Sequence, residues 1–294
     1  MTTLADMHIG FIGLGLMGKP MARNLMLAGA NMTIHNRSQG VVEELTRDGM
    51  INGKSPAGVA AEAGTIITML SDTPAVETVM TGENGLIEAL RPGTLVIDMS
   101  TTKVPETRAL AAKVAEKGCD YVDAPVSGGT IGAEQGTLTI MAGGTDAAFQ
   151  RAHAVFAVLG SHVTHVGDVG AGQVAKAANQ VIVGLNIGAV AEALTLARKA
   201  GVDPAKVREA LRGGFADSRI LEVHGQRMVE RTFAPGAKSV TQRKDMDQAI
   251  ELAASLGFEL PATALSRDLY DKLIADGNGD LDHSALIKAI DPEA

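Results

Sequence analysis

The hydrophobic positions of this 294-residue chain change their pattern once, near residue 170. Before that point, short apolar runs alternate with segments in which apolar residues recur every three or four positions. Such runs are typical of strands buried on both faces, and such segments of amphipathic helices. We expect strands at 8–12, 32–35, 66–70 and 94–98, a further strand at 121–124 and closing strands at 136–142 and 162–166. The helical segments lie at 17–28, 56–63, 74–80, 104–117 and 146–159. This alternation predicts an α/β fold with a largely parallel sheet.

The second part of the chain lacks strand patterns and shows helical periodicity to its end. A long, mostly apolar helical pattern opens at Gly170 and runs to about Ala200, where Gly201 ends it. Further helix boundaries fall near residues 213, 235, 257 and 277, at glycine or proline. We therefore predict an α/β Rossmann-type N-terminal domain over residues 1–167 and an all-α C-terminal domain over residues 168–294. A long interdomain helix joins the two.

A glycine-rich loop separates the first apolar run from the first helical segment. The loop has the pattern G-x-G-x-x-G, between a predicted strand and a predicted helix, which is the context that dinucleotide binding requires. The first glycine allows a tight turn, the second lets the pyrophosphate approach the backbone, and the third lets helix and strand pack closely. We expect the cofactor to be bound here by Gly13, Leu14, Gly15, Leu16, Met17 and Gly18.

The residues after the second apolar run bear on the choice of nucleotide. NAD-specific folds usually carry an acidic residue there, which accepts from the ribose 2′-hydroxyl, whereas this chain has Asn36, Arg37 and Ser38. Asn36 does not repel a 2′-phosphate, and Arg37 can pair with one through its planar guanidinium. A surface arginine on a solvated loop is the alternative. We expect these three residues to contact the cofactor, with NADP(H) favoured and NAD(H) possible.

Two further segments carry polar groups where a ligand could bind. Ser127, Gly128 and Gly129 follow a strand and offer a hydroxyl and unobstructed N–H groups that suit a carboxylate or phosphate; a plain glycine-rich turn is the alternative. On the long helix, Lys176 and Asn179 share one face. A lysine on such an apolar helix either has a partner or a task, or extends to the surface.

Composition excludes several classes of partner. The formal net charge of −8 argues against nucleic acid, and no run of 18 or more apolar residues is free of polar interruption, so we expect no membrane span. The single Cys119 fits a reducing compartment, and no signal peptide is evident, so we expect a cytoplasmic protein. Residues 276–287 lack the glycine and glutamate of a calcium loop, and His162 and His165 face opposite sides of a strand. We therefore expect no metal site.

Four motifs together resemble the β-hydroxyacid dehydrogenase family. They are residues 10–18, 123–129 and 170–179 and the pair Lys244-Asp245, in the family's order and spacing along the whole chain. The resemblance implies an NAD(P)-dependent oxidoreductase with Lys176 as catalytic residue and Gly172 leaving space for the nicotinamide ring. It also implies substrate contacts from Ser127, Gly128, Gly129, Asn179 and Asp245, and cofactor contacts from Met69, Leu70, Thr101 and Lys244.

Within the family, residues 211–214 and 282–286 look most like members that reduce tartronate semialdehyde (2-hydroxy-3-oxopropanoate) to D-glycerate. Members acting on 3-hydroxyisobutyrate, glyoxylate or succinic semialdehyde share less of these segments. Asn36 departs from the acidic residue of the tartronate enzymes, which puts NADH use in doubt. Imine reductases, which generally lack the lysine, and a non-catalytic nucleotide-binding relative are more distant alternatives. The long apolar helix face favours self-association, and the resemblance implies a homodimer or homotetramer.

Overall fold

A computed structural model describes residues 4–293 of the chain. The chain divides into two compact units, Met1–Lys176 and Ala177–Ala294. Each unit is described by itself below.

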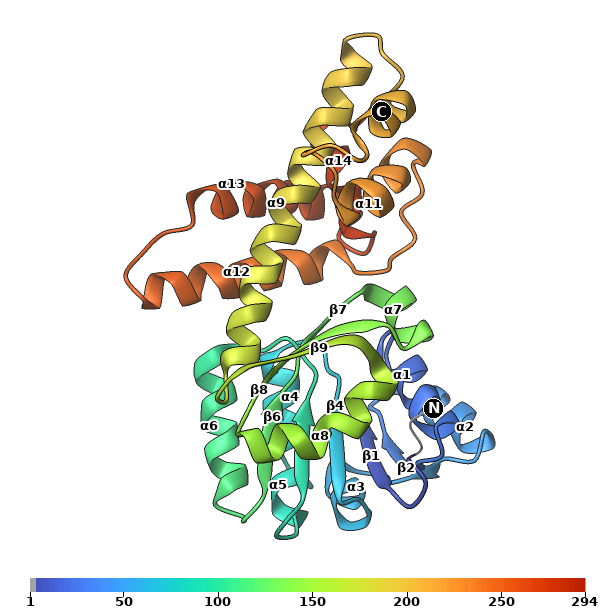
Figure 1. Ribbon diagram of the computed structural model, residues 1–294, viewed down its shortest axis with the longest axis vertical. Coiled ribbons are helices and arrows are strands. Elements are labelled where there is room, and N and C mark those ends of the chain that lie inside the picture. The colour runs from blue at the N-terminus through green and yellow to red at the C-terminus, as the bar shows by residue number, and fades with distance from the viewer. Residues whose placement is uncertain (1–3, 294) are drawn as a thin grey trace. The chain divides into compact units, whose positions relative to one another are not determined.

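The first unit is built on a twisted sheet with the strand order β3-β2-β1-β4-β5-β6-β8-β7, and β9 pairs with β8. The strands from β3 to β6 in this order are parallel, and β1, β2, β4 and β6 are labelled in Figure 1. This order places β1 and β4 side by side, at the point where the strand order reverses and where such sheets bind ligands. The parallel strands are β1 (His8–Ile12), β2 (Asn31–His35), β3 (Ile51–Asn52), β4 (Thr65–Thr68), β5 (Leu95–Asp98) and β6 (Asp120–Asp123).

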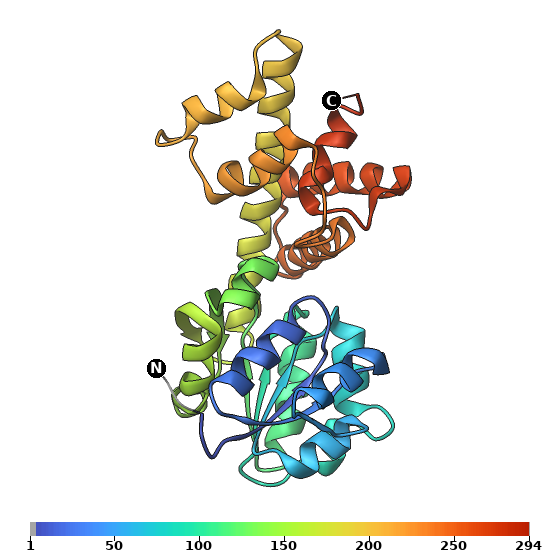
Figure 2. The same ribbon diagram turned by 90° about the vertical axis from the view of Figure 1, so that its right-hand side faces the viewer.

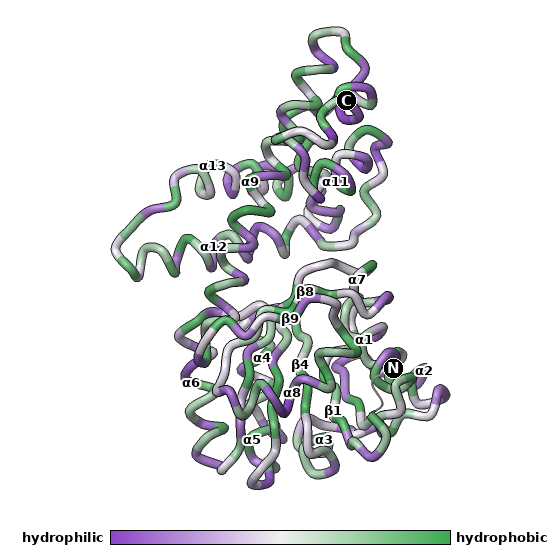
Figure 3. The backbone as a smooth tube through the Cα atoms, in the orientation of Figure 1, coloured by the Kyte–Doolittle hydropathy of each residue, from purple (hydrophilic) through white to green (hydrophobic). Residues whose placement is uncertain are grey.

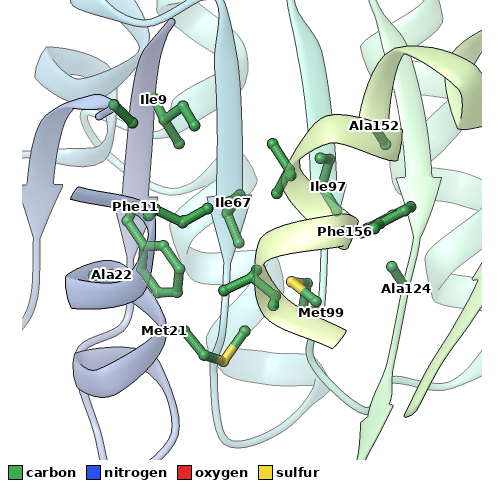
Figure 4. Packing of buried hydrophobic residues seen from close by; sticks show 14 of the residues in the cluster. Ile9, Phe11, Met21, Ala22, Ile67, Ile97, Met99, Ala124, Ala152 and Phe156 are labelled. Carbon is green, nitrogen blue, oxygen red and sulfur yellow. The ribbon is translucent and has the colours of Figure 1, made fainter. Parts of the chain in front are cut away.

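Helices cover both faces of this sheet. One core contains Phe11 and Ile97 on the strands, with side chains of α1, α2 and α8 packed over them; Figure 4 shows Phe156 of α8 lying against this face. The second core lies under α3, α4, α5 and α6. The helices are α1 (Gly18–Leu27), α2 (Gln39–Arg47), α3 (Pro56–Glu62), α4 (Thr73–Thr81), α5 (Leu86–Ala89), α6 (Val104–Ala115) and α8 (Asp146–Leu159).

The sheet is extended beyond β6 by strands of mixed direction. β8 (Leu138–Gly143) runs antiparallel to β6 and to the short β7 (Val126–Ser127), while β9 (Gly160–Gly167) runs parallel to β8. A short helix, α7 (Gly129–Gln135), connects β7 to β8. This extension places the loop after β6, with Ser127, Gly128 and Gly129, at the strand ends where ligands bind.

The regular elements that the structure describes in the second unit are all helices, and a single isolated β-bridge joins Lys238 and Asp282. Ile187, Leu194 and Tyr270 belong to its buried core, and the shorter helices pack around the C-terminal part of α9 (Figure 2). Hydrophobic and hydrophilic positions alternate along α9, α12 and α13 in Figure 3, as expected for helices with one buried face. The helices are α9 (Ala171–Lys199), α10 (Pro204–Leu211), α11 (Arg219–Glu230), α12 (Ser239–Ser255), α13 (Pro261–Leu273) and α14 (Ile287–Ile290), with a π-helical turn at Ile274–Asn278 and a 3-10 helix at His283–Leu286.

The predicted architecture is confirmed: an α/β Rossmann-type region is followed by a helical region, and a long helix begins near residue 170. The nine-residue α2 was not predicted from the sequence, and neither were the short elements β3, β7, α5 and α7. Two to seven residues carry too little periodicity to be recognised, and pairing with neighbouring strands stabilises β3 and β7.

Candidate active site

The glycine loop after β1 has the geometry that its sequence pattern requires. Gly13 adopts φ +100°, and a Cβ at this position would lie 2.2 Å from the Met69 main-chain oxygen. A Cβ at Gly18 would lie 1.8 Å from the Gly13 oxygen, so α1 and β1 pack too closely for any other residue. A Cβ at Gly15 would meet no atom within 4 Å. The middle glycine therefore leaves room for a phosphate beside the N-terminus of α1.

The end of β2 is tied to the glycine loop by Asn36. Its Oδ1 accepts a hydrogen bond from the Leu14 N–H at 3.0 Å, and its Nδ2 donates to the Ser38 carbonyl at 3.1 Å. Asn36 therefore also holds the loop in place, a role that the sequence did not reveal. Arg37 is exposed beside it, where its guanidinium is accessible to a ligand phosphate.

The loops after β4 and β5 carry three other predicted cofactor residues. Leu70 donates its N–H to Ser100 Oγ at 2.9 Å, and Met69 packs against Gly13. Thr101 lies between Ser100 and Thr102, whose main-chain groups are both bound by the buried side chain of Gln173, at 2.8 and 3.0 Å. Gln173 on α9 therefore fixes the loop that contains Thr101. It was not predicted, because one glutamine on an apolar helix gives no signal of its partner.

Asp123, at the end of β6, anchors the start of α9. Its Oδ1 accepts the Gly170 N–H at 2.7 Å and its Oδ2 accepts the Gln173 N–H at 2.9 Å. Burial raises the pKa of Asp123 to about 7, although the two N–H groups lower it. Asp98 at the end of β5 is also buried, which raises its pKa, although hydrogen bonds from Ser100 and Thr68 oppose this. The first turn of α9 is therefore attached to the sheet through a buried carboxyl group.

Lys176 is buried, at 7% exposure, and does not extend to the surface. Its Nζ donates to the Val126 carbonyl at 2.9 Å. Val126 directly precedes Ser127, and Gly128 and Gly129 follow with φ of +134° and +59°, conformations that favour glycine. The structure therefore brings the lysine ammonium next to the loop that was predicted to bind a carboxylate.

Gly172 has a different role from the one expected of it. A Cβ at this position would lie 2.4 Å from the Met141 oxygen and 2.6 Å from the Asp123 oxygen. The expectation that Gly172 leaves space for a nicotinamide ring is wrong, because main-chain atoms of β8 and β6 fill that space. The glycine instead allows the first turn of α9 to approach the sheet closely.

The predicted residues of the second unit form a group of their own. Asn179 Nδ2 donates to Gln180 Oε1 at 2.7 Å, and Gln180 Nε2 donates to Asp245 Oδ2 at 2.6 Å. Lys244 Nζ lies 2.9 Å from Asp245 Oδ1. Asn179, Asp245 and Lys244 are thus connected, through the unpredicted Gln180.

The chain matches one family model in each of its two parts. Residues 8–167 match the family model for the NAD binding domain of 6-phosphogluconate dehydrogenase. Residues 170–290 match the model for the NAD-binding domain of NADP-dependent 3-hydroxyisobutyrate dehydrogenase. The chain is 48% identical to 2-hydroxy-3-oxopropionate reductase of Escherichia coli (strain K12), over 97% of each protein. It belongs to the β-hydroxyacid dehydrogenase family.

Two other members show the breadth of this β-hydroxyacid dehydrogenase family. The chain is 40% identical to 2-(hydroxymethyl)glutarate dehydrogenase of Eubacterium barkeri, over 96% of this chain and 94% of that one. The solved structure of Mycobacterium tuberculosis 3-hydroxyisobutyrate dehydrogenase with L-serine has a TM-score of 0.89 and 32% identity, covering 97% of this chain and 99% of that one. The chain is therefore an NAD(P)-dependent oxidoreductase of small hydroxy acids or semialdehydes.

Helix α9 of this dehydrogenase is long and apolar enough, by length and composition, to cross a membrane. Its buried Gln173 and Lys176 are hydrogen-bonded to loops of the first unit's sheet, and its buried Ile187 and Leu194 belong to the core of the second unit. These are the contacts of a core helix, and the family model that matches residues 170–290 covers the whole of it.

A histidine cluster in the second unit was also not predicted. His224, Asp282 and His283 have side-chain ligand atoms within 4.8 Å of one another. The Asp282 carboxylate already accepts hydrogen bonds from Gly236 N, Ala237 N, Ser284 N and Ser284 Oγ, and it pairs with Arg227 at 2.7 Å. Burial raises the pKa of Asp282, but the hydrogen bond from His224, the charge of His283 and the hydrogen bonds from Ser284 and Gly236 N hold it well below its usual range. Because the Asp282 oxygens are already occupied by these hydrogen bonds and this ion pair, the carboxylate has a structural role and is not a metal ligand.

Proposed function

We propose that this enzyme uses NADPH, in preference to NADH, to reduce tartronate semialdehyde to D-glycerate. The observation that carries the proposal is the buried Lys176 ammonium beside the Ser127 loop, 2.9 Å from the Val126 carbonyl. The 48% identity to the Escherichia coli 2-hydroxy-3-oxopropionate reductase supports this substrate over others of the family.

Lys176 can act as the proton donor of the reduction. When bound, the reduced nicotinamide supplies the hydride that converts the aldehyde carbon into an alcohol carbon. Negative charge develops on the aldehyde oxygen, where the ammonium of Lys176 can stabilise it and then donate a proton. The N–H groups and hydroxyl of residues 127–129 would hold the substrate carboxylate, and Asn179, one helical turn beyond Lys176, would orient the substrate.

The residues of the first unit fit a dinucleotide. The open position at Gly15 would admit the pyrophosphate, within the loop 13–18, and Arg37 would contact a 2′-phosphate. Met69, Leu70 and Thr101 would line the same cofactor. From the second unit, Lys244 would add a positive charge for the cofactor and Asp245 a contact for the substrate.

The remaining alternatives differ in substrate or in chemistry. 3-Hydroxyisobutyrate, glyoxylate and succinic semialdehyde carry the same carboxylate and are the competing substrates. The buried Lys176 argues against both an imine reductase and a non-catalytic relative, since each would be expected to lack it. We also propose that residues 1–167 form the NAD(P)-binding domain and residues 168–294 the domain for substrate binding and oligomerisation. We further propose that the protein is a homodimer or homotetramer and is located in the cytoplasm. The largely exposed Ile182 and Leu196 of α9 support self-association.

A substrate panel with a lysine variant tests the proposal. The four candidate substrates are assayed with NADPH and with NADH, and we expect the highest kcat/KM for tartronate semialdehyde with NADPH. Lys176→Ala should lower kcat by about 10²- to 10⁴-fold, the range typical of a lost general acid, with unchanged NADPH affinity. Lys113→Ala, an exposed lysine on α6, is the matched control and should match the wild type. Wild-type turnover by Lys176→Ala would overturn the assigned role.

A further inference from the structure

A chain of buried amide side chains connects Asn179 to the histidine cluster of the second unit. Gln180 Nε2 lies 3.2 Å from Gln242 Oε1, besides its 2.6 Å bond to Asp245. Gln242 is 1% exposed, and its Nε2 donates to the Gln180 main-chain oxygen at 3.1 Å. On its other side, Gln242 Oε1 lies 3.4 Å from His283 Nδ1.

The polarity of each amide in this chain is determined by its neighbour. A main-chain oxygen only accepts, so Gln242 must present its Nε2 to Gln180 O and its Oε1 to the Gln180 side chain. Gln180 must then present Nε2 to Gln242 and Asp245, which are both acceptors. Its Oε1 consequently faces Asn179, which donates from Nδ2. One side-chain orientation satisfies all three amides.

His283 supports the far end of this chain. Its Nδ1 must donate, because Gln242 Oε1 accepts. Its main chain is fixed by a bond from His283 N to the Ala237 carbonyl at 2.9 Å and by Tyr270 OH, which donates to the His283 carbonyl at 3.1 Å. Its Nε2 lies 3.2 Å from His224 Nε2. The histidine is thus held by the main chain and by the cluster around Asp282.

We propose that Gln242 and His283 are positioning residues that fix the orientation of the Asn179 side-chain amide, and so determine where its Oδ1 and its Nδ2 lie relative to the substrate. Because one Nδ2 hydrogen is donated to Gln180, Asn179 offers its Oδ1 acceptor and its second Nδ2 hydrogen to a ligand. The sequence alone shows that residue 179 carries an amide. The hydrogen-bond network determines on which side its oxygen and its nitrogen lie.

This polarity has a consequence for substrate choice, which rests on the proposed function. In tartronate semialdehyde the carboxylate and the aldehyde are hydrogen-bond acceptors, and the 2-hydroxyl is the donor group. An oriented Asn179 Oδ1 therefore recognises the 2-hydroxyl. The enzyme should favour this aldehyde over 3-oxopropanoate, which lacks that hydroxyl, by about 10-fold in kcat/KM, the usual effect of one buried hydrogen bond.

The test compares both aldehydes in variants of the network. Gln242→Met and His283→Leu should bring the preference for the hydroxylated aldehyde close to one, with kcat/KM for 3-oxopropanoate changed less than about 3-fold. His283→Asn keeps a donor near the position of Nδ1 and should restore most of the preference. Gln226→Met is the matched control, because Gln226 of α11 is hydrogen-bonded to Glu230 and lies outside the network. This variant should keep the preference for the hydroxylated aldehyde. Thermal unfolding shows which variants are folded.

A preference that survives in folded Gln242→Met and His283→Leu overturns the proposal. A second measurement does not depend on turnover: hydrogen exchange of the Asn179 side-chain amide, in protein labelled with ¹⁵N on its Asn and Gln side chains. We expect at least about 10-fold faster exchange in Gln242→Met than in the wild type, and equal rates would overturn the positioning role. If the wild type reduces neither aldehyde, the proposed function fails, and the exchange rates still decide on the network.

Discussion

Replacing Gly172 by alanine tests whether the close approach of α9 to the sheet sets the position of Lys176. The new Cβ would lie 2.4 Å from the Met141 oxygen, about 1 Å short of ordinary van der Waals contact. The Asp123 main-chain oxygen, at 2.6 Å, blocks a second direction. Neither obstacle is a flexible side chain, so the first turn of α9 must move away from the sheet.

The size of the effect follows from this displacement. Hydrogen bonds of 2.7 to 2.9 Å join Asp123 to Gly170 and Gln173, and a shift of about 1 Å breaks bonds of this length. Overpacking of this kind costs about 1–3 kcal/mol of unfolding free energy. Lys176, one turn further along, is displaced with its helix, and a misplacement of about 1 Å lowers turnover by about 10²-fold.

The assay measures kcat and KM with NADPH, and the free energy of unfolding in urea. Gly188→Ala is a matched control, since it makes the same change on the same helix. There a Cβ would lie 3.6 Å from Ser266 Oγ, an ordinary contact, and alanine should be neutral or stabilising by up to about 1 kcal/mol. We expect Gly172→Ala to lose kcat and stability, and Gly188→Ala to keep both.

Wild-type kcat and stability in Gly172→Ala would refute the reasoning, because they would show that α9 can shift at no cost. Equal losses of kcat and stability in both alanine variants would also refute it, since any glycine-to-alanine change on α9 would then have the same effect, whatever its contacts. If the stability falls while kcat is unchanged, the close packing is confirmed and its link to Lys176 is wrong.

Two further predictions concern charge. Arg37→Ala should raise KM for NADPH by about 10- to 100-fold, the effect of losing a charge-assisted hydrogen bond, and leave KM for NADH unchanged; activity with NADPH that does not respond to the change contradicts the preferred cofactor. Asp123 has a folded pKa of about 7 against 3.8 for the ordinary group, so its stabilising contribution is complete below about pH 4 and is lost as the pH rises to about 7. The unfolding free energy of the wild type relative to Asp123→Asn should therefore fall by up to about 4 kcal/mol between pH 4 and pH 8 in urea titrations, and a difference that is constant or rises with pH would speak against it.

The parts of the molecule predicted from the sequence are those that local physics determines. Strands buried on both faces appear as short apolar runs, and amphipathic helices have a period that can be counted. The loop at residues 13–18 needs glycine for reasons of backbone geometry alone. Gly13 and Gly18 are accordingly enclosed by main-chain atoms, as the pattern predicts. For Lys176 the sequence left two alternatives, a partner or a task on the one hand and extension to the surface on the other. Its burial, at 7% exposure, excludes the second.

The parts that were missed depend on partners far away in the chain. Gln180 and Gln242 are 62 residues apart, and no spacing rule relates a glutamine on one helix to a glutamine on another. Gly172 was misread for a similar reason. A glycine shows that a side chain is excluded, but the sequence does not say whether a ligand or the protein's own backbone excludes it.

Helix α9 nevertheless carries a polar pattern that is visible in the amino-acid sequence itself. Gln173, Lys176 and Gln180 are spaced by three and four residues, so they form one stripe on a mostly apolar helix. All three are buried, and burying a polar group without a partner costs several kcal/mol. The stripe therefore predicts that polar partners face it along two turns, and the structure supplies them: the loop after β5 for Gln173, the Val126 carbonyl for Lys176, and Gln242 with Asp245 for Gln180. In an apolar helix, buried polar residues at this spacing indicate a polar site rather than a lipid-facing surface.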